Sequence, residues 1–236
     1  MLNESVGIIG YGEIGKSIAK FYDNPRIKDL DRNDGLWGVD ILHICIPYRS
    51  NFVKIVRKEI MEIKPKLTII NSTVPPGTTK KIGGMTVHSP VRGTHPDLHE
   101  SLKTFIKYVG ADNKNAGRKA RKHFAKIGIK TKMFVPSETT ELGKLLSTTY
   151  YGLCIAFHGE ANKLCEKYGV DFDQAMTDFN KTYNRDYPGL GRPEVVRPVL
   201  SAPENDRIGG HCIIPNAEIL KKHIKSHAIK LILKYK

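Results

Sequence analysis

The sequence predicts an α/β protein in which a doubly wound parallel sheet over residues 1–136 precedes a smaller all-helical domain over residues 137–236. In the first part, short β-branched apolar segments alternate with segments of helical period, the pattern of parallel strands joined by right-handed crossovers. A glycine-rich turn follows the first apolar segment. After residue 136 the strand pattern ends and a helical period continues for about thirty residues.

The expected strands are short apolar runs between turn residues. They are residues 5–10, 26–31, 40–46 and 67–71, with weaker patterns at 85–88, 107–110 and 131–135. Amphipathic helices are expected after the glycine turn, over 51–63 and over 113–126. The first of these ends near Asn24, because the following Pro25 disfavours helix in the residue before it.

The second part is predicted to be helical around one long helix. This helix starts at Pro136-Ser137 and ends at Gly169, a suitable C-terminal cap. A second helix is expected over 172–183, then a loop rich in Pro, Gly and Arg over 187–208, then an amphipathic helix from about Asn216. We expect the long helix to form the spine of a subdomain or the interface of a homodimer.

The composition is that of an ordinary globular protein, with 40% hydrophobic and 26% charged residues in a chain of 236. Its longest apolar stretch, Val39 to Pro47, is too short to span a bilayer. The N-terminus runs almost directly into a strand, so we expect no signal peptide. Four cysteines without CxxC spacing predict no metal site and fit a reducing, cytoplasmic location.

The net charge of +14 is concentrated in two segments, residues 103–132 with +9 and residues 217–236 with +5. A solvated basic helix face is the simplest interpretation. Binding of an anionic polymer is the alternative, although no nucleic-acid motif accompanies the charge, so nucleic acid is an unlikely partner.

Gly10-x-Gly12-x-x-Gly15 lies between a strand and a helix, where a dinucleotide-binding turn of the Rossmann type requires it. Gly10 allows the tight turn, Gly12 lets backbone N–H groups approach a pyrophosphate, and Gly15 allows close helix packing. Glu13 and Ile14 begin the helix whose N-terminus forms the anion site. The alternative is a degenerate domain that keeps these glycines for packing only.

An acidic residue at the end of the second strand is expected to bind the adenosine ribose, and Asp29 and Asp31 both qualify. Either would repel a 2′-phosphate, which favours NAD over NADP. The neighbouring Arg32 leaves NADP open, because an arginine can accommodate that phosphate.

Ser72 and Thr73 follow a buried strand at the edge where ligands of such sheets bind. Their hydroxyls either contact cofactor or substrate, or cap the helix that follows Pro75-Pro76. The spacing alone does not decide between these two interpretations.

Two further groups carry chemically useful side chains. Glu141, Lys144 and Thr148 form one polar stripe on the long helix, for which a Glu–Lys surface pair is the simplest explanation. Cys212 follows Gly209-Gly210-His211 and precedes a helix. A helix N-terminus and a nearby His lower a thiol's pKa, so we favour Cys212 as a nucleophile.

Together these motifs resemble the UDP-glucose/GDP-mannose (nucleotide-sugar) 6-dehydrogenase family over nearly the whole chain, and most of all its UDP-N-acetylmannosamine dehydrogenase branch. The motifs that carry the resemblance are Val6-Gly-Ile-Ile-Gly-Tyr-Gly-Glu-Ile-Gly15, His43-Ile-Cys-Ile-Pro47, Ser72-Thr-Val-Pro-Pro-Gly-Thr78, Glu141-Leu-Gly-Lys144, Ile155-Ala-Phe-His-Gly-Glu160, Leu164-Cys-Glu-Lys-Tyr-Gly169 and Gly209-Gly-His-Cys-Ile213.

The resemblance implies a two-step oxidation of a sugar C6 alcohol to a carboxylate with two NAD. It implies that Cys212 attacks the aldehyde intermediate, that Lys144 stabilises the oxyanion and that Thr73 lies near the nicotinamide, with Pro47 and Ser72 on the cofactor side. The substrate would be a nucleotide sugar or another phosphorylated hydroxy compound.

Several residues depart from the family pattern. Thr148 replaces an Asn, Asn216 replaces an Asp, Val91 replaces the glutamate tied to thioester hydrolysis, and Gly159 replaces a helix Asn. We also expect the family's second Rossmann-like domain to be absent. Three hypotheses therefore stand: a compact dehydrogenase, a catalytically impaired NAD-binding relative acting as sensor or scaffold, and a protein that binds polyanions.

Overall fold

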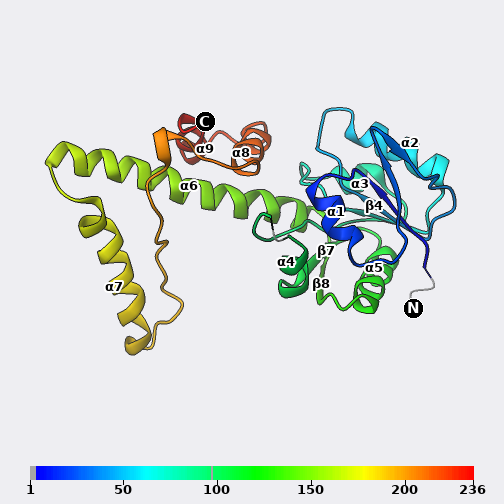
Figure 1. Ribbon diagram of the computed structural model, residues 1–236, viewed down its shortest axis with the longest axis horizontal. Helices are drawn as coiled ribbons and strands as arrows, with labels where there is room; N and C mark the ends of the chain where they lie inside the picture. Colours follow the sequence, from blue (N-terminus) through cyan, green and yellow to red (C-terminus); the bar gives the residue numbers. More distant parts are fainter. Residues whose placement is uncertain (1–3, 97) are drawn as a thin grey trace. The chain divides into compact units, whose positions relative to one another are not determined.

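The computed structural model describes residues 4–96 and 98–236, which divide into two compact units, Met1–Lys144 and Leu145–Lys236 (Figure 1). The first unit is built around one sheet of eight strands. They are β1 (Val6–Ile9), β2 (Arg26–Asp29), β3 (Arg32–Asn33), β4 (Ile41–Ile44), β5 (Leu67–Ile70), β6 (Thr86–His88), β7 (Lys107–Gly110) and β8 (Thr131–Phe134). All the expected strand segments therefore belong to this unit.

The spatial order of the strands is β3-β2-β1-β4-β5-β6-β7-β8. The run from β2 to β6 is parallel, as expected, with Ile8 opposite both Ile27 and His43. Two pairs are antiparallel, β2 with β3 and β6 with β7, so the fully parallel sheet was wrong in these places. β3 has two residues, both exposed, and β7 has three of its four residues buried, so neither strand carries the alternating apolar pattern that indicates an antiparallel strand.

The second expected strand also ends early. It was expected to run to Asp31, but β2 ends at Asp29 and the chain turns through Leu30 and Asp31 into β3. Leu30 is 97% exposed in this turn, so its apolar side chain is not part of the buried strand pattern from which the longer strand was expected. The turn leaves Asp29 at the carboxyl end of β2.

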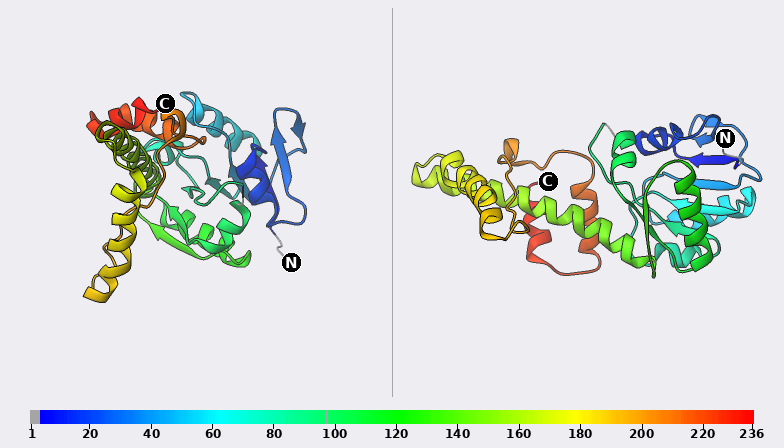
Figure 2. Two further views of the ribbon diagram at one scale, coloured as in Figure 1. Left: turned by 60° about the vertical axis from the view of Figure 1, so that its left-hand side comes forward. Right: turned by 90° about the horizontal axis from the view of Figure 1, so that it is seen from below.

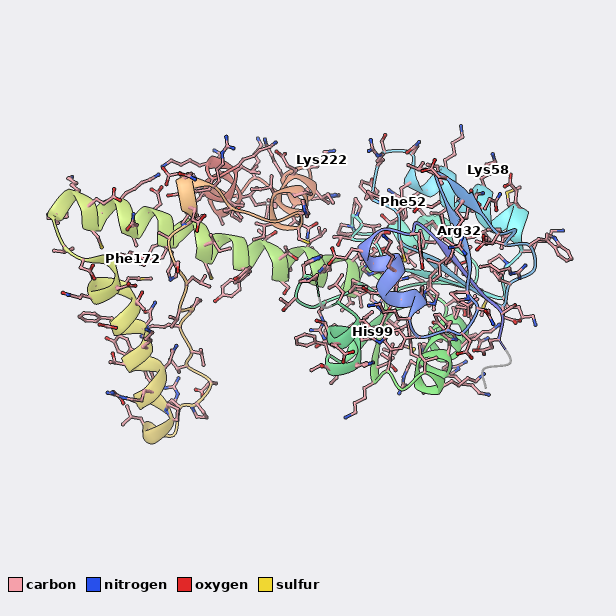
Figure 3. All side chains as sticks on the ribbon, in the orientation of Figure 1. Arg32, Phe52, Lys58, His99, Phe172 and Lys222 are labelled. Carbon is pink, nitrogen blue, oxygen red and sulfur yellow. The ribbon has the colours of Figure 1, made fainter. Side chains whose placement is uncertain are left out.

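Helices cover both faces of the sheet in Figure 1, and each face has its own hydrophobic core. The helices of this unit are α1 (Glu13–Ala19), α2 (Phe52–Ile63), α3 (Thr78–Ile82), α4 (Leu98–Thr104) and α5 (Lys114–Lys126). One core contains Ile18, Leu102 and Phe124 from α1, α4 and α5. The other contains Phe52, labelled in Figure 3, and Ile82 from α2 and α3. The sequence pattern did not predict α4.

The long helix α6 (Glu138–Tyr168) begins in the first unit and continues through the second, close to its expected bounds. In the second unit, α8 (Ile213–Lys221) and α9 (His227–Lys234) lie beside α6 in Figures 1 and 2. They pack closely because α6 presents glycines: a Cβ on Gly152 would lie 2.3 Å from Ile213, and one on Gly159 would lie 2.5 Å from the Tyr235 ring.

Two helices of the second unit differ from expectation. The helix expected over 172–183 is a π-helical segment, Asp173–Asp178, followed by α7 (Phe179–Asp186). The last helix was expected from about Asn216 but begins at Ile213, with Pro215 in its first turn, where a missing N–H costs no helical hydrogen bond. Within residues 4–96 and 98–236, no helix is both long enough and apolar enough to cross a bilayer.

Candidate functional site

The glycine turn has the backbone geometry that close approach of a ligand requires. Gly10 has a positive φ of +91°, and a Cβ there would lie 2.9 Å from the Cys45 backbone. A Cβ on Gly15 would lie 2.0 Å from the Gly10 carbonyl oxygen, so the helix can start this close to the turn only with glycine. A Cβ on Gly12 would meet no atom within 4 Å, which leaves the space beside its backbone open.

Asp29 is the acidic residue that reaches this turn. Its Oδ2 accepts a hydrogen bond from the Tyr11 backbone N–H at 2.6 Å, and its Oδ1 accepts one from the Leu30 N–H at 2.7 Å. Asp31 lies in the exposed turn after β2. Of the two candidates that the sequence left open, Asp29 is therefore the one beside the dinucleotide-type turn.

Arg32 lies on β3 and is labelled in Figure 3. Its guanidinium is 5.6 Å from the centre of the Tyr11 ring and donates hydrogen bonds to both carboxylate oxygens of Asp34. The hydrogen bonds from Arg32 hold the pKa of Asp34 below its usual value. Arg32 is therefore placed beside the turn, where an arginine accommodates a 2′-phosphate in NADP-binding domains.

Glu13 and Ile14 open α1 as expected, but they face different surroundings. Ile14 packs against the core. The Glu13 carboxylate is 2.5 Å from Nδ1 of His95, which comes from the loop after β6. This loop therefore reaches the N-terminal end of α1, a contact between residues 82 positions apart in the chain.

The segment after β5 that carries Ser72 and Thr73 is fixed by neighbouring strands. The Ser72 hydroxyl donates to the Ile46 carbonyl at 2.6 Å, directly before Pro47, which is exposed. The Ser72 carbonyl lies 3.1 Å from Nε2 of His88 on β6. Thr73 is half-buried at this same edge. Pro47, Ser72 and Thr73 thus gather at the carboxyl ends of β4 and β5.

Helix α3 is capped by Glu141 and not by Ser72 or Thr73. The Glu141 carboxylate accepts hydrogen bonds from the Gly77 and Thr79 N–H groups and from the Thr79 hydroxyl, at 2.6–2.7 Å. The capping alternative for Ser72 and Thr73 is therefore wrong. The surface pair expected for Glu141 is also wrong, because this side chain has no exposed area. Burial raises the pKa of Glu141.

Lys144 follows Glu141 by one helical turn, and its charge is felt by two buried basic groups. One is His88, whose pKa is lowered to about 3, mainly by burial, with Lys144 contributing. The other is Lys107, whose pKa is lowered to about 7, again mainly by burial. The Lys107 ammonium donates hydrogen bonds to the carbonyls of Ser89 and Pro90. The basic segment is therefore not wholly a solvated face.

Cys212, Asn216 and Thr148 lie in the second unit. Cys212 is the N-cap residue of α8, is half-buried, and its carbonyl accepts a hydrogen bond from the Asn216 N–H at 3.1 Å. The Asn216 side chain is 4% exposed, and its Nδ2 has no hydrogen-bond partner among the described residues. Thr148 is half-buried on α6.

The structure accounts for two departures from the family pattern. Val91 is 5% exposed and belongs to the core beside α1 and α5, so a carboxylate at this position would be buried without a place in the site. Gly159 lies under the Tyr235 ring, which leaves no space for an asparagine. Within the described part of the chain, no group of three or more His, Cys, Asp or Glu could hold a metal ion.

Several residues at or near the site were missed at the sequence level. They are His88, His95 and Lys107. Each lies at least 16 positions along the chain from the residue it contacts, so no local pattern predicts these contacts. A histidine or lysine within a short apolar strand, as at His88 and Lys107, was the available signal.

Comparisons with known proteins identify relatives of the chain. UDP-N-acetyl-D-mannosamine dehydrogenase of Pyrococcus horikoshii is 25% identical over 252 residues, covering 95% of this chain and 56% of the relative. The protein of the same name from Methanococcus maripaludis is 31% identical over 156 residues, covering 62% of this chain and 33% of the relative. No protein-family model matches the chain.

Solved structures share the fold. The structure of UDP-D-ManNAc dehydrogenase from P. horikoshii has a TM-score of 0.78 at 19% identity and covers 98% of this chain and 68% of the other. The 3-hydroxyisobutyrate dehydrogenase of Mycobacterium tuberculosis has a TM-score of 0.69 at 13% identity, covering 98% and 91%.

These comparisons confirm the resemblance to nucleotide-sugar dehydrogenases and the Rossmann-type fold. The chain is dehydrogenase-like, since the named relatives are dehydrogenases. It spans about half the length of the first of these curated relatives, at 56%.

Proposed function

We propose that the chain is an NAD-dependent oxidoreductase of the nucleotide-sugar dehydrogenase kind. The observation that carries the proposal is the turn Gly10–Gly15 with Asp29 hydrogen-bonded to its backbone. Ser72 and Thr73 lie at the carboxyl edge of the same sheet. In open α/β sheets, dinucleotides bind at this edge.

The residues of the first unit fit such a cofactor. The open space beside Gly12 and the backbone N–H groups at the start of α1 suit a pyrophosphate. Asp29 has lone pairs left for ribose hydroxyls, and its charge favours NAD over NADP. Pro47, Ser72 and Thr73 would border the nicotinamide. Bound there, NAD would supply the hydride acceptor for each of the two oxidations of the substrate carbon.

The residues assigned to chemistry act on the substrate as follows. Oxidation of the alcohol to an aldehyde releases a hydride, for which NAD would be the acceptor, and a proton, which passes to solvent. The Cys212 thiolate adds to the aldehyde carbon, and Lys144 stabilises the resulting oxyanion. The thiohemiacetal gives up a second hydride to become a thioester, and water cleaves this to release the carboxylate and restore the thiol.

The departures bear on the last step most strongly. Asn216 cannot act as a carboxylate base, and Val91 places an apolar side chain in the core where the family carries a glutamate. Thr148 donates and accepts through one hydroxyl oxygen, whereas an asparagine has a separate carbonyl acceptor and an NH₂ group with two donor hydrogens. We therefore expect thioester hydrolysis to be the slowest step. An NAD-binding relative without turnover remains the alternative function.

Homodimer formation is part of the proposal. Apolar side chains at heptad-like intervals along α6 are exposed in this single chain: Leu146, Tyr150, Phe157, Leu164 and Tyr168. Spacings of four and seven residues place them on one helix face. Covering this stripe by a second α6 would bury it. The substrate is proposed to be a nucleotide sugar and the location cytoplasmic.

NADH formation with a panel of nucleotide sugars tests the activity, alongside NAD binding by calorimetry. NAD binding without any turnover would support the impaired relative and refute the enzyme. Cys212→Ala is expected to abolish acid formation and leave NAD affinity unchanged. Cys165→Ala, at a buried cysteine on α6, is the matched control. Acid formation by Cys212→Ala at the wild-type rate would exclude the thiol as nucleophile.

A further inference from the structure

A continuous chain of buried and half-buried polar side chains crosses the first unit and ends beside the Ser72–Thr73 segment. We call it the histidine chain, and its members in order are Glu4, His123, Tyr22, His43 and Asn71. The successive distances are 2.8, 2.8, 3.0 and 3.1 Å. Glu4 precedes β1, His123 lies on α5 and Tyr22 follows α1. His43 lies on β4, and Asn71 directly follows β5. The proposed chemistry uses none of these side chains.

Hydrogen-bond accounting gives the chain a direction, starting from Asn71. Its Nδ2 is 3.1 Å from Nδ1 of His43 and 3.2 Å from the Ile69 carbonyl. The carbonyl accepts only, so the amide nitrogen must face it, and Nδ1 of His43 must be the unprotonated acceptor. A neutral His43 then carries its proton on Nε2 and donates it to the Tyr22 oxygen.

The other end gives the same direction. Burial disfavours the Glu4 carboxylate, but hydrogen bonds from His123 and Lys126 keep its pKa below the usual value, so Glu4 accepts. Nδ1 of His123 therefore donates to Glu4. The Nε2 of a neutral His123 is then an acceptor, and it takes the hydroxyl proton of Tyr22. The two histidines must hold opposite tautomers.

The surroundings keep the two histidine rings neutral. Burial, with the charges of His123 and Lys107, lowers the pKa of His43 well below its usual value. Burial also lowers the pKa of His123, against the opposing effect of Glu4. The remaining ionisable groups facing the chain are Lys126, paired with Glu4 at 2.7 Å, and the Cys45 thiol beside Asn71. Burial raises the pKa values of the Cys45 thiol and the Tyr22 phenol.

Asn71 has a second orientation available. Its Oδ1 is buried and has no hydrogen-bond partner among the described residues. If acid adds a proton to His123, its Nε2 must donate to Tyr22, and the Tyr22 hydroxyl must turn to Nε2 of His43. The His43 proton then moves to Nδ1, which needs an acceptor. Rotation of the Asn71 amide supplies Oδ1 for this bond and removes the donor from the Ile69 carbonyl.

We infer that the histidine chain positions the Ser72–Thr73 segment by holding the Asn71 amide in one orientation, and that acid reverses the chain and turns this amide. Asn71 is covalently joined to Ser72, whose hydroxyl and carbonyl both take part in hydrogen bonds with neighbouring strands. The members of the chain are positioning residues. Their effect on the cofactor rests on the proposed function.

Two-dimensional long-range ¹H–¹⁵N NMR of the full chain tests the direction, because it reports which ring nitrogen of each histidine is protonated. At pH 7.5 we expect His43 protonated on Nε2 and His123 on Nδ1. Equal tautomers, or a charged ring at either position, would overturn the inference. On acidification, the signals of both rings and the Ser72 and Thr73 amides should shift together. Independent midpoints would also overturn it.

Tyr22→Phe cuts the chain and keeps the ring. We expect the Ser72 and Thr73 amide resonances to move in this variant and to stay in place in Tyr235→Phe, which loses a hydroxyl bond to Glu160 in the other unit. Unmoved amides in Tyr22→Phe would refute the positioning role. If Tyr22→Phe does not fold, the wild-type acid titration decides the question by itself.

NADH affinity connects the chain to the proposed function. We expect Tyr22→Phe to weaken NADH binding about fivefold at pH 7.5, the equivalent of one hydrogen bond of about 1 kcal/mol, with Tyr235→Phe unchanged. Unchanged affinity in Tyr22→Phe would overturn the effect on the cofactor. If the wild type binds no NADH at any pH, the proposed function fails, while the tautomers and the amide shifts still decide on the chain.

Discussion

Lys107 should make the free energy of unfolding of the first unit depend on pH between about 7 and 10.5. It begins β7 with 4% exposure, and its ammonium is 2.8 Å from the Ser89 carbonyl oxygen. Burial lowers its pKa from 10.5 to about 7. The folded protein therefore gives up this proton near neutral pH, whereas the unfolded chain keeps it up to pH 10.5.

The sign and size follow from proton linkage. Between the two pKa values the unfolded chain binds more protons, so the free energy of unfolding rises with pH, by up to about 1.4 kcal/mol per pH unit. From pH 7.5 to 9.5 the rise from this one group amounts to about 2–3 kcal/mol. Below pH 7 both states bind the proton and the contribution becomes constant.

Lys107→Met removes the titrating group and keeps most of the apolar stem. Urea unfolding of both proteins at pH 7.5, 8.5 and 9.5 gives the difference in free energy at each pH. We expect wild type to gain about 2–3 kcal/mol over Lys107→Met across this range. Lys122→Met, on the exposed face of α5, is the control and should run parallel to wild type. Parallel curves for Lys107→Met would refute a buried, neutral amine.

Three further predictions concern packing and the site. Gly15→Ala should lower both stability and NADH affinity, because its Cβ would lie 2.0 Å from the Gly10 carbonyl oxygen. Gly12→Ala should lower NADH affinity and leave the melting temperature unchanged, because a Cβ there meets no atom within 4 Å. Equal melting temperatures in the two variants would contradict this. Gly159→Asn should lower the free energy of unfolding in urea by about 1–3 kcal/mol, because the new side chain overpacks against the Tyr235 ring. The loss should be much smaller in a Tyr235→Ala background. An equal loss in both backgrounds would show that the ring is not the cause. Glu141→Gln should cost about 1–3 kcal/mol, because one amide oxygen replaces a carboxylate that accepts three hydrogen bonds; a cost equal to that of Glu138→Gln, the control at the start of α6, would contradict the capping role.

Local patterns were sufficient for most of the elements. The glycine turn, the buried strands and the long helix each depend on a period or a turn residue within a few positions, and each appears within a few residues of its expected bounds. The motifs also sufficed for the resemblance to nucleotide-sugar dehydrogenases, which the relatives confirm.

Contacts between distant segments required the tertiary structure. The direction of β7, the cap that Glu141 supplies to α3 and the approach of His95 to Glu13 each join residues more than twenty positions apart. Burial changes the chemistry of such residues: Glu141 passes from an expected surface ion to a buried cap, and Lys107 from a surface cation to an amine with a pKa of about 7.

The amino-acid sequence by itself therefore determined the fold class, the dinucleotide-type turn and the candidate thiol at Cys212, because each depends on residue type and local spacing. Only the tertiary structure selected Asp29 over Asp31, gave Glu141 its partners and revealed the histidine chain. Hydrogen bonding and desolvation depend on which groups meet in space. That information lies in the packing of the whole first unit and not in any single segment.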